Sequence, residues 1–292
     1  MERELWSALY FVAKRLDKPW GSWRYSASDV LMVHFWAVVH DRPESWAAEA
    51  RNWPAELRPK PLPSQSTLSR RMRKADAVQL MLEVENHLVG LLAIAGYWVR
   101  TIDAKPLAVS GVSKDPDAGY GRGAGGHQKG YKFYAVWGAG SMPIAWALAP
   151  MNVSEKTVAR QLIPSLPQGG YLLGDTMYDV NWLYDLAAEA GYQLLAPKTK
   201  DRGRGGLGHR RQSPHRLRSI RMLKEPFGRA LYQQRRGIER CFGTWTCFGG
   251  GMAPLPAWVR RFPRVRNWVH TKLLIAGARR LLIDDPHKLA VA

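Results

Sequence analysis

The spacing of the apolar residues changes near Gly96, and this change limits the folds open to the chain. Before Gly96, apolar residues recur every three or four positions, as on one face of an α-helix. From Tyr97 onward the apolar stretches are short and separated by turn-forming residues, a pattern typical of β-strands that alternate with helices. We therefore predict two domains: an all-α N-terminal region, residues 1–95, and an α/β domain, residues 96–292.

The N-terminal region is expected to form helices around residues 5–12, 27–39, 46–50, 65–74 and 75–95. The helix at 65–74 is short and basic, with Arg70 and Arg71 expected at its surface, and it resembles the recognition helix of a helix-turn-helix. The Pro-rich connector before it, residues 59–63, is longer than the turn of that motif. A solvated basic helix is an equally good interpretation.

The second region has the order strand, two-stranded hairpin, helix, strand, helix, strand and a late helix. The expected strands are 98–103, 131–137, 143–148, 171–174 and 193–196, and the expected helices are 154–163, 179–190 and one around Glu239. Residues 110–130 are rich in glycine and are expected to form a mobile loop. By analogy, this order predicts a ribonuclease-H-like mixed sheet with flanking helices.

The charge of the chain points to a polyanionic partner. Lys and Arg number 43 against 24 Asp and Glu, which gives a formal charge of +19, and such an excess favours nucleic acid. Residues 198–224 form a basic insertion suited to following DNA phosphates, with Arg210 and Arg211 as candidate contacts. The longest apolar run, residues 88–99, is too short to span a bilayer, so no membrane partner is expected.

Three acidic residues are candidates for a metal site. Asp103 ends the first expected strand, Asp175 follows the fourth, and Glu239 lies on the late helix. These strand ends are neighbours in the predicted sheet, and three clustered carboxylates need cations to neutralise them. Oxygen ligands favour Mg²⁺ or Mn²⁺, and two such ions support phosphodiester cleavage. The ordinary alternatives are a turn cap for Asp175 and an ion-paired helix residue for Glu239.

The late helix carries a second pattern. Leu231, Ile238, Phe242 and Trp245 fall on one apolar stripe of a single expected helix. Tyr232, Arg235 and Glu239 are three and four residues apart, so they share a neighbouring face.

Four motifs in residues 97–250 resemble those of bacterial insertion-sequence DDE transposases. In chain order they are Ile102-Asp103, Gly174-Asp175-Thr176-Met177-Tyr178-Asp179, Ala196-Pro197-Lys198, and a Tyr-x2-Arg-x3-Glu signature at Tyr232, Arg235 and Glu239. They are similar to the first aspartate, the second-aspartate motif, the strand after it and the signature around the catalytic glutamate. One departure is Thr246, which stands where the family often has Lys.

The resemblance implies an enzyme that cuts transposon ends and joins the freed 3′-hydroxyl to target DNA. Asp103, Asp175 and Glu239 would be catalytic and would hold two Mg²⁺ or Mn²⁺ ions. Tyr232 and Arg235 would contact DNA phosphates near the cut, with Arg240 as a further contact. The partner would be double-stranded DNA, bound by a homodimer.

Two other functions remain open at this stage. A ribonuclease-H-like nuclease would use the same carboxylates without joining strands. A domesticated DNA-binding protein would be expected to lack a carboxylate, whereas all three are present. The two cysteines fit neither a zinc pair nor a disulfide framework, and no signal peptide is apparent. We therefore expect a cytoplasmic, nucleoid-associated bacterial protein.

Overall fold

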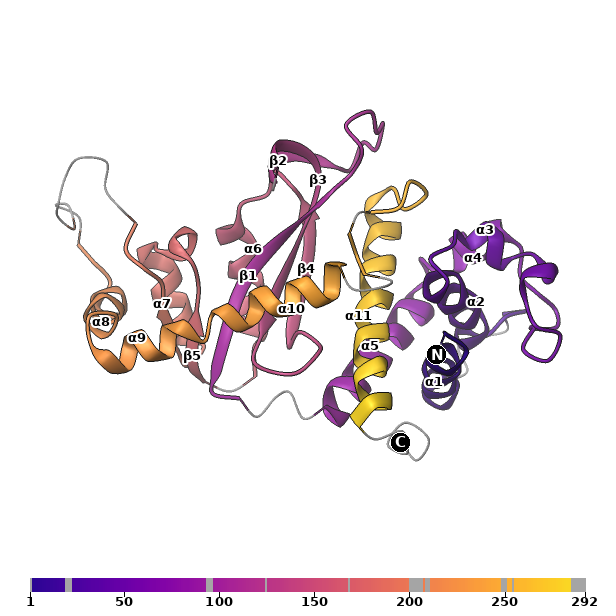
Figure 1. Cartoon of the computed structure of the whole chain (residues 1–292), viewed down its shortest axis with the longest axis horizontal. Coiled ribbons are helices and arrows are strands. Elements are labelled where there is room, and N and C mark those ends of the chain that lie inside the picture. Colours follow the sequence, from indigo (N-terminus) through magenta and orange to yellow (C-terminus); the bar gives the residue numbers. More distant parts are fainter. Residues whose placement is uncertain are drawn as a thin grey trace. The chain divides into compact units, whose positions relative to one another are not determined.

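The computed structural model describes residues 2–18, 23–92, 97–123, 125–167, 169–199, 207, 211–247, 251–253 and 255–284 (Figure 1). The chain divides into two compact units. Unit 1 joins residues 1–93 to residues 245–292, and unit 2 comprises residues 94–244. The chain thus leaves the first unit near residue 94 and returns to it at Trp245.

Unit 1 is helical in the part that the structure describes. Its elements are α1 (Glu2–Leu16), α2 (Ala27–Val39), α3 (Glu44–Ala47), η1 (Ala50–Asn52), α4 (Gln65–Arg71), α5 (Ala75–Leu91) and α11 (Phe262–Asp284). The apolar α2 is the central helix, and α1, α5 and α11 pack against it. Ser26 begins α2 with a capping box, in which its hydroxyl accepts from the Asp29 amide.

Buried polar residues fasten α11 onto α2. Lys272 forms an ion pair with Asp41, and the His34 ring lies between the Glu44 carboxylate, at 3.0 Å, and the Thr271 hydroxyl, at 3.1 Å. Buried polar groups stabilise a fold only when they are partnered, and these are. The sequence analysis assigned the C-terminal segment to the second domain, whereas α11 packs within unit 1.

Unit 2 is built on a six-stranded mixed sheet. Its strands are β1 (Val99–Ala108), β2 (Gly119–Gly123), β3 (Gly126–Trp137), β4 (Ala145–Pro150), β5 (Gly170–Leu173) and β6 (Tyr192–Leu195). The order is β2-β3-β1-β5-β6, and β4 also pairs with β3. β1 is antiparallel to β3 but parallel to β5. This topology is that of a ribonuclease-H-like sheet, which confirms the predicted fold class.

Side chains of the sheet alternate between its two faces. Ile102 and Leu172 point into the main core, which α6 (Glu155–Leu162) and α7 (Asn181–Glu189) cover. Their neighbours point to the opposite face, where Leu173 packs against Leu231 of α9 (Pro226–Gln233).

The helix α10 (Arg236–Cys247) lies across this second face (Figure 1). Phe242 of α10 meets Phe133 of β3 edge to face, with ring centroids 5.9 Å apart. Gly237 packs on Trp137, so closely that a Cβ at Gly237 would collide with the indole ring. The absence of a side chain at Gly237 therefore lets α10 approach the sheet.

Two strand predictions need correction. β1 was expected to end at Asp103 but continues to Ala108, because β3 pairs with it along that length. Residues 119–123 were expected to lie in a mobile loop, yet they form β2, hydrogen-bonded to the start of β3. Glycine has low strand propensity, which hid β2. Here it is needed, since a Cβ at Gly121 would clash with the Met151 carbonyl.

The late segment also differs from its prediction of one helix. It forms two helices, α9 and α10. Between them the backbone hydrogen bonds span three residues rather than the four of an α-helix, from the Arg235 amide to the Tyr232 carbonyl and from the Ile238 amide to the Arg235 carbonyl. The predicted apolar stripe is nevertheless buried, with Ile238 and Phe242 0% and 4% exposed.

Leu172→Ala tests the sheet core. Leu172 is fully buried between the sheet and its covering helices, so its truncation should lower the free energy of unfolding by about 2–5 kcal/mol. Leu217→Ala is the control, because Leu217 is 39% exposed and its loss should cost less than about 0.5 kcal/mol. Denaturant unfolding measures both, and equal effects would contradict this description of the core.

Candidate active site

Asp103 lies in the middle of β1, opposite Ala135 of β3. Because Ile102 points into the main core, the alternation of the strand turns Asp103 to the face that carries α10. Its Oδ1 accepts a hydrogen bond from the Ala104 amide at 2.8 Å.

Asp175 lies just after β5, the strand that pairs in parallel with β1. Thr101 of β1 pairs with Leu173 at the end of β5, and Asp175 follows two residues later, near enough for its charge to raise the pKa of Asp103. Asp175 follows the end of β5 and caps the short helix η4 (Thr176–Tyr178), accepting the Met177 amide at 2.8 Å through Oδ1. The turn cap considered in the sequence analysis is thus present, and it leaves Asp175 at the predicted strand end.

Arg235 bridges two of the three candidate carboxylates, Asp103 and Glu239. Its guanidinium donates to Asp103 Oδ2 at 3.0 Å and to Glu239 Oε1 at 2.9 Å. One planar guanidinium spans both contacts, so these carboxylate oxygens are no more than about 8 Å apart. Glu239 is the more exposed of the pair, with 58% of its side chain accessible against 19% for Asp103.

Tyr232 connects α9 to the end of β5, next to Asp175. Its hydroxyl donates to the Gly174 carbonyl at 3.1 Å, one residue before Asp175. The signature residues Tyr232, Arg235 and Glu239 therefore lie at the end of β5 and over the middle of β1, as their spacing predicts for one face of a late helical segment.

Burial and neighbouring charges shape the electrostatics of Asp103. Burial raises the pKa of Asp103 to about 6, and the negative charge of Asp175 adds to this rise. The Ala104 amide and the Arg235 guanidinium act in the opposite direction. Even with Arg235 alongside, this carboxylate lies where an additional cation would stabilise its charged form.

The carboxylates have the chemistry of a magnesium site, since hard oxygen donors suit that ion. Their side chains do not converge on one point in this arrangement: Asp103 and Glu239 turn to Arg235, and Asp175 turns to the Met177 amide. Among the residues that the structure describes, no group of three His, Cys, Asp or Glu side chains could hold an ion as placed.

The comparisons with known proteins decide the family. A model of the transposase DDE domain matches residues 94–275, more than half of the chain. The chain belongs to the DDE transposase family. No curated protein and no solved structure matches it. Membership makes it a transposase-type, polynucleotidyl-transferase-like enzyme that acts on DNA, in a family that generally uses divalent metal ions.

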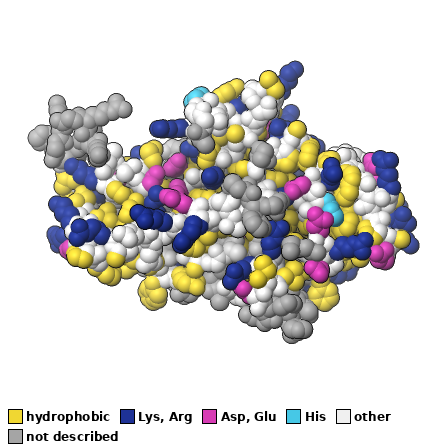
Figure 2. Space-filling view, viewed as in Figure 1, with side chains coloured by type: hydrophobic (Ala, Val, Ile, Leu, Met, Phe, Trp, Pro, Cys, Tyr) yellow, Lys and Arg dark blue, Asp and Glu magenta, His cyan; other side chains and the backbone are white. Residues whose placement is uncertain are grey.

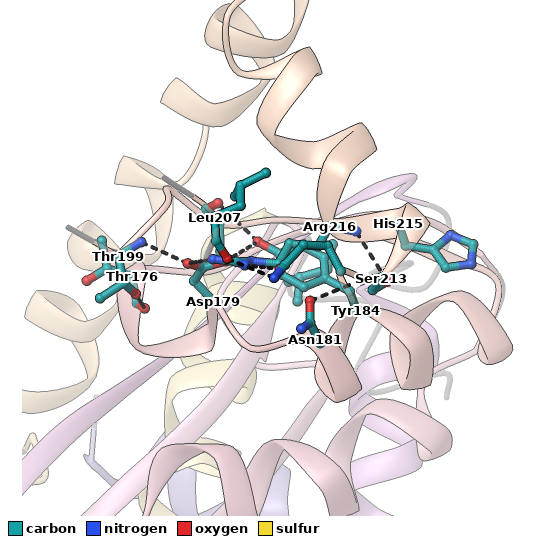
Figure 3. Close-up of polar contacts among 12 residues, drawn as sticks. Thr176, Asp179, Asn181, Tyr184, Thr199, Leu207, Ser213, His215 and Arg216 are labelled. Atoms are coloured by element: carbon teal, nitrogen blue, oxygen red, sulfur yellow. Dashed lines mark hydrogen bonds and ion pairs between the residues drawn. The ribbon is translucent and has the colours of Figure 1, made fainter. Parts of the chain in front are cut away.

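The transposase also holds the buried Asp179, the last residue of the second-aspartate motif, in a partly exposed network (Figure 3). Arg216 of α8 (Pro214–Met222) donates to both carboxylate oxygens at 2.7 Å, and the Thr199 amide donates at 2.8 Å. The Thr199 hydroxyl then reaches the Thr176 carbonyl at 3.1 Å. The turn that follows Asp175 is thereby fixed to the segment after β6 and to α8.

The contacts of this network could not be predicted from the sequence. Asp179 lay within the quoted motif, but its partner is 37 residues away in a stretch read only as a basic insertion. The described part of that insertion contains the helix α8, which begins at a Ser213 cap with Pro214 in its first turn. The buried ion pair reveals Arg216 as a structural residue of this stretch.

The predicted DNA contacts lie in different surroundings. Arg70, Arg211 and Arg240 are exposed, and Arg210 lies outside the described residues. Arg71 was expected at the surface, but it is buried and paired with Asp76 at 2.6 Å. Arg71 is buried because it pairs with this carboxylate, five residues further along the chain. On the face shown in Figure 2, Lys and Arg side chains spread over the region of α8, α9 and α10, beside a group of acidic side chains.

Cys241 has a free thiol, whose pKa burial raises to about 11, and the Cys247 side chain lies outside the described residues. In the described part of the chain, no helix has both the length and the apolar character needed to cross a bilayer.

Gly237→Val tests how α10 positions Glu239. The added side chain would collide with Trp137 and push the start of α10 off the sheet. We expect DNA cleavage to fall at least about tenfold, because small displacements of reacting groups are costly, while DNA binding is retained. Gly243→Ala on the same helix has open space and should cleave normally. Unchanged cleavage by Gly237→Val would show that this contact does not set the position of Glu239.

Asp179→Asn tests the buried ion pair through pH. Burial alone would raise the pKa of Asp179, but the Arg216 guanidinium and the Thr199 amide overcome it and hold the pKa below the ordinary 3.8. The stabilisation is therefore present above about pH 4 and is lost as pH falls through the lower folded value. Near pH 7 the variant should lose about 3–5 kcal/mol of unfolding free energy, since the largely buried Arg216 charge no longer faces a carboxylate.

The measurement is denaturant unfolding of both proteins from pH 7 to pH 3. The difference between wild type and Asp179→Asn should shrink below about pH 4. Glu189→Gln removes the same charge from an exposed position of α7 and should show little difference at any pH. A stability difference that stays constant to pH 3 would mean that the ionised carboxylate is not what stabilises the network.

Proposed function

We propose that this enzyme cuts DNA at transposon ends and joins the freed 3′-hydroxyl to target DNA in an Mg²⁺- or Mn²⁺-dependent reaction. The observation that supports it most is the bridge from Arg235 to Asp103 and Glu239, residues 132 and 4 positions away in sequence. Together with the β1–β5 register, this bridge sets the signature residues over the middle of β1 and beside the end of β5.

In this proposal Asp103, Asp175 and Glu239 are the catalytic residues and would hold two metal ions. Such ions, when bound, activate the attacking hydroxyl and stabilise the leaving oxygen. The chain itself positions the carboxylates through β1, the η4 cap and α10. Only 19% of the Asp103 side chain is accessible, and this shielding from bulk water would strengthen its attraction to a cation.

The basic side chains around the site would hold the DNA. Arg235 and Tyr232 lie beside the carboxylates and would contact phosphates near the cut, while Arg240 and Arg211 would extend the contact along the duplex. We further propose that the enzyme works as a homodimer on double-stranded transposon ends. A cytoplasmic, nucleoid-associated location completes the proposal.

Glu239→Gln separates chemistry from binding. It keeps the shape of the side chain but removes a charge from the proposed metal site. Cleavage should fall at least about 100-fold, since loss of even an outer-shell partner of a metal ligand costs about 10–100-fold. End binding should survive or tighten slightly, because a negative charge near phosphates is gone. Glu225→Gln, an exposed Glu before α9, is the matched control.

End binding and Mg²⁺-dependent cleavage are measured side by side, with Arg235→Ala as a third variant. Arg235→Ala should weaken both, because it removes a phosphate contact and the bridge between two carboxylates. If Glu239→Gln cleaves like the wild type, Glu239 is only an ion-paired helix residue. Cleavage by the wild type without joining of a pre-cut 3′-hydroxyl end would instead favour a nuclease.

A further inference from the structure

A groove of about 640 Å³ lies on unit 1, apart from the residues of the candidate active site. It is lined by residues just before α2 and by residues of α4 and its flanks, among them Trp23, Arg24, Tyr25, Ser64, Arg70 and Lys74. None of the described residues that line it is acidic. The groove is therefore electropositive, with an aromatic ring in its wall.

Trp23 is 54% exposed, and one side of its ring is in contact with Arg71. The Arg71 guanidinium lies 4.6 Å from the centre of the Trp23 ring, a stacking distance for a cation over an indole. Arg71 is itself fixed by two bonds to Asp76, at 3.0 and 2.6 Å, and by one to the Tyr25 carbonyl, at 3.2 Å. Arg71, paired with Asp76, thus supports one face of the exposed Trp23 ring, which we call the Trp23 platform.

Three cations surround this platform. Arg24, Arg70 and Lys74 are exposed, and none of them forms an ion pair with another described residue. Cations that follow a backbone beside an aromatic ring are the elements with which proteins bind single-stranded DNA. Paired and stacked bases of a duplex cannot place a ring face on Trp23, whereas an unpaired base can.

We propose that this groove binds a single DNA strand, with an unpaired base stacked on Trp23 and the flanking phosphates on Arg24, Arg70 and Lys74. Arg71, predicted from sequence to contact DNA, would act indirectly as the residue that positions Trp23. The inference rests on the proposed function only for the identity of the polyanion, DNA.

The test is fluorescence anisotropy of the full chain with a labelled single strand and with the blunt duplex of the same sequence, without divalent metal. Trp23→Ala should weaken single-strand binding about tenfold and duplex binding less than about twofold. Trp23→Phe, which keeps a ring, should restore most of the affinity. Trp182→Ala is the matched control, since Trp182 is also exposed beneath an Arg, Arg160, at 4.4 Å, and its loss should leave both affinities unchanged.

The cations are tested by Arg70→Ala combined with Lys74→Ala, which should lower the salt slope of single-strand binding by about one unit. Unchanged single-strand affinity for Trp23→Ala would overturn the proposal. So would an equal loss for single strand and duplex, or a loss that Trp182→Ala reproduces. Because cleavage is not read in this assay, a failure of the transposase proposal and a failure of this one can be told apart.

Discussion

The parallel pairing of β1 with β5 is the constraint on which the candidate site depends. It sets the register in which Asp103 and Asp175 come side by side, and both strands are held by a core that includes Ile102 and Leu172. The carboxylates are costly to bring together, because like charges repel and burial penalises the ionised form. The apolar core on the opposite face of the sheet provides the stabilisation that offsets this cost.

Two further contacts position the candidate site on the face of the sheet that carries α10. Gly237 allows α10 to lie against Trp137, and Arg235 then reaches both Asp103 and Glu239. Arg235 thus serves as an internal counter-ion for two of the carboxylates proposed to be catalytic. The network around Asp179 fixes the turn after Asp175 by a separate route, through Thr199 and Arg216. Each candidate carboxylate is positioned by contacts that come from distant parts of the sequence.

The ribonuclease-H-like fold class and five of the six strands could be predicted from the sequence because their signals are local. Short apolar runs ended by turn residues mark β5 and β6, and the motifs carry Asp103, Asp175 and Glu239. It failed where tertiary contacts decide. The glycine content of residues 119–123 argued against a strand, but β2 forms because it pairs with β3. Asp76 lies five residues after Arg71, which is not the three- or four-residue spacing that predicts a helical ion pair. The role of the three carboxylates is still a prediction.

Binding of Mn²⁺ to the full chain, followed by electron paramagnetic resonance, tests the central claim most directly. If Asp103, Asp175 and Glu239 form one metal site, then Asp103→Asn, Asp175→Asn and Glu239→Gln should each weaken Mn²⁺ binding strongly, while Glu225→Gln should not. Mn²⁺ binding that persists at wild-type affinity when any one of the three is replaced would remove that residue from the site and contradict the account.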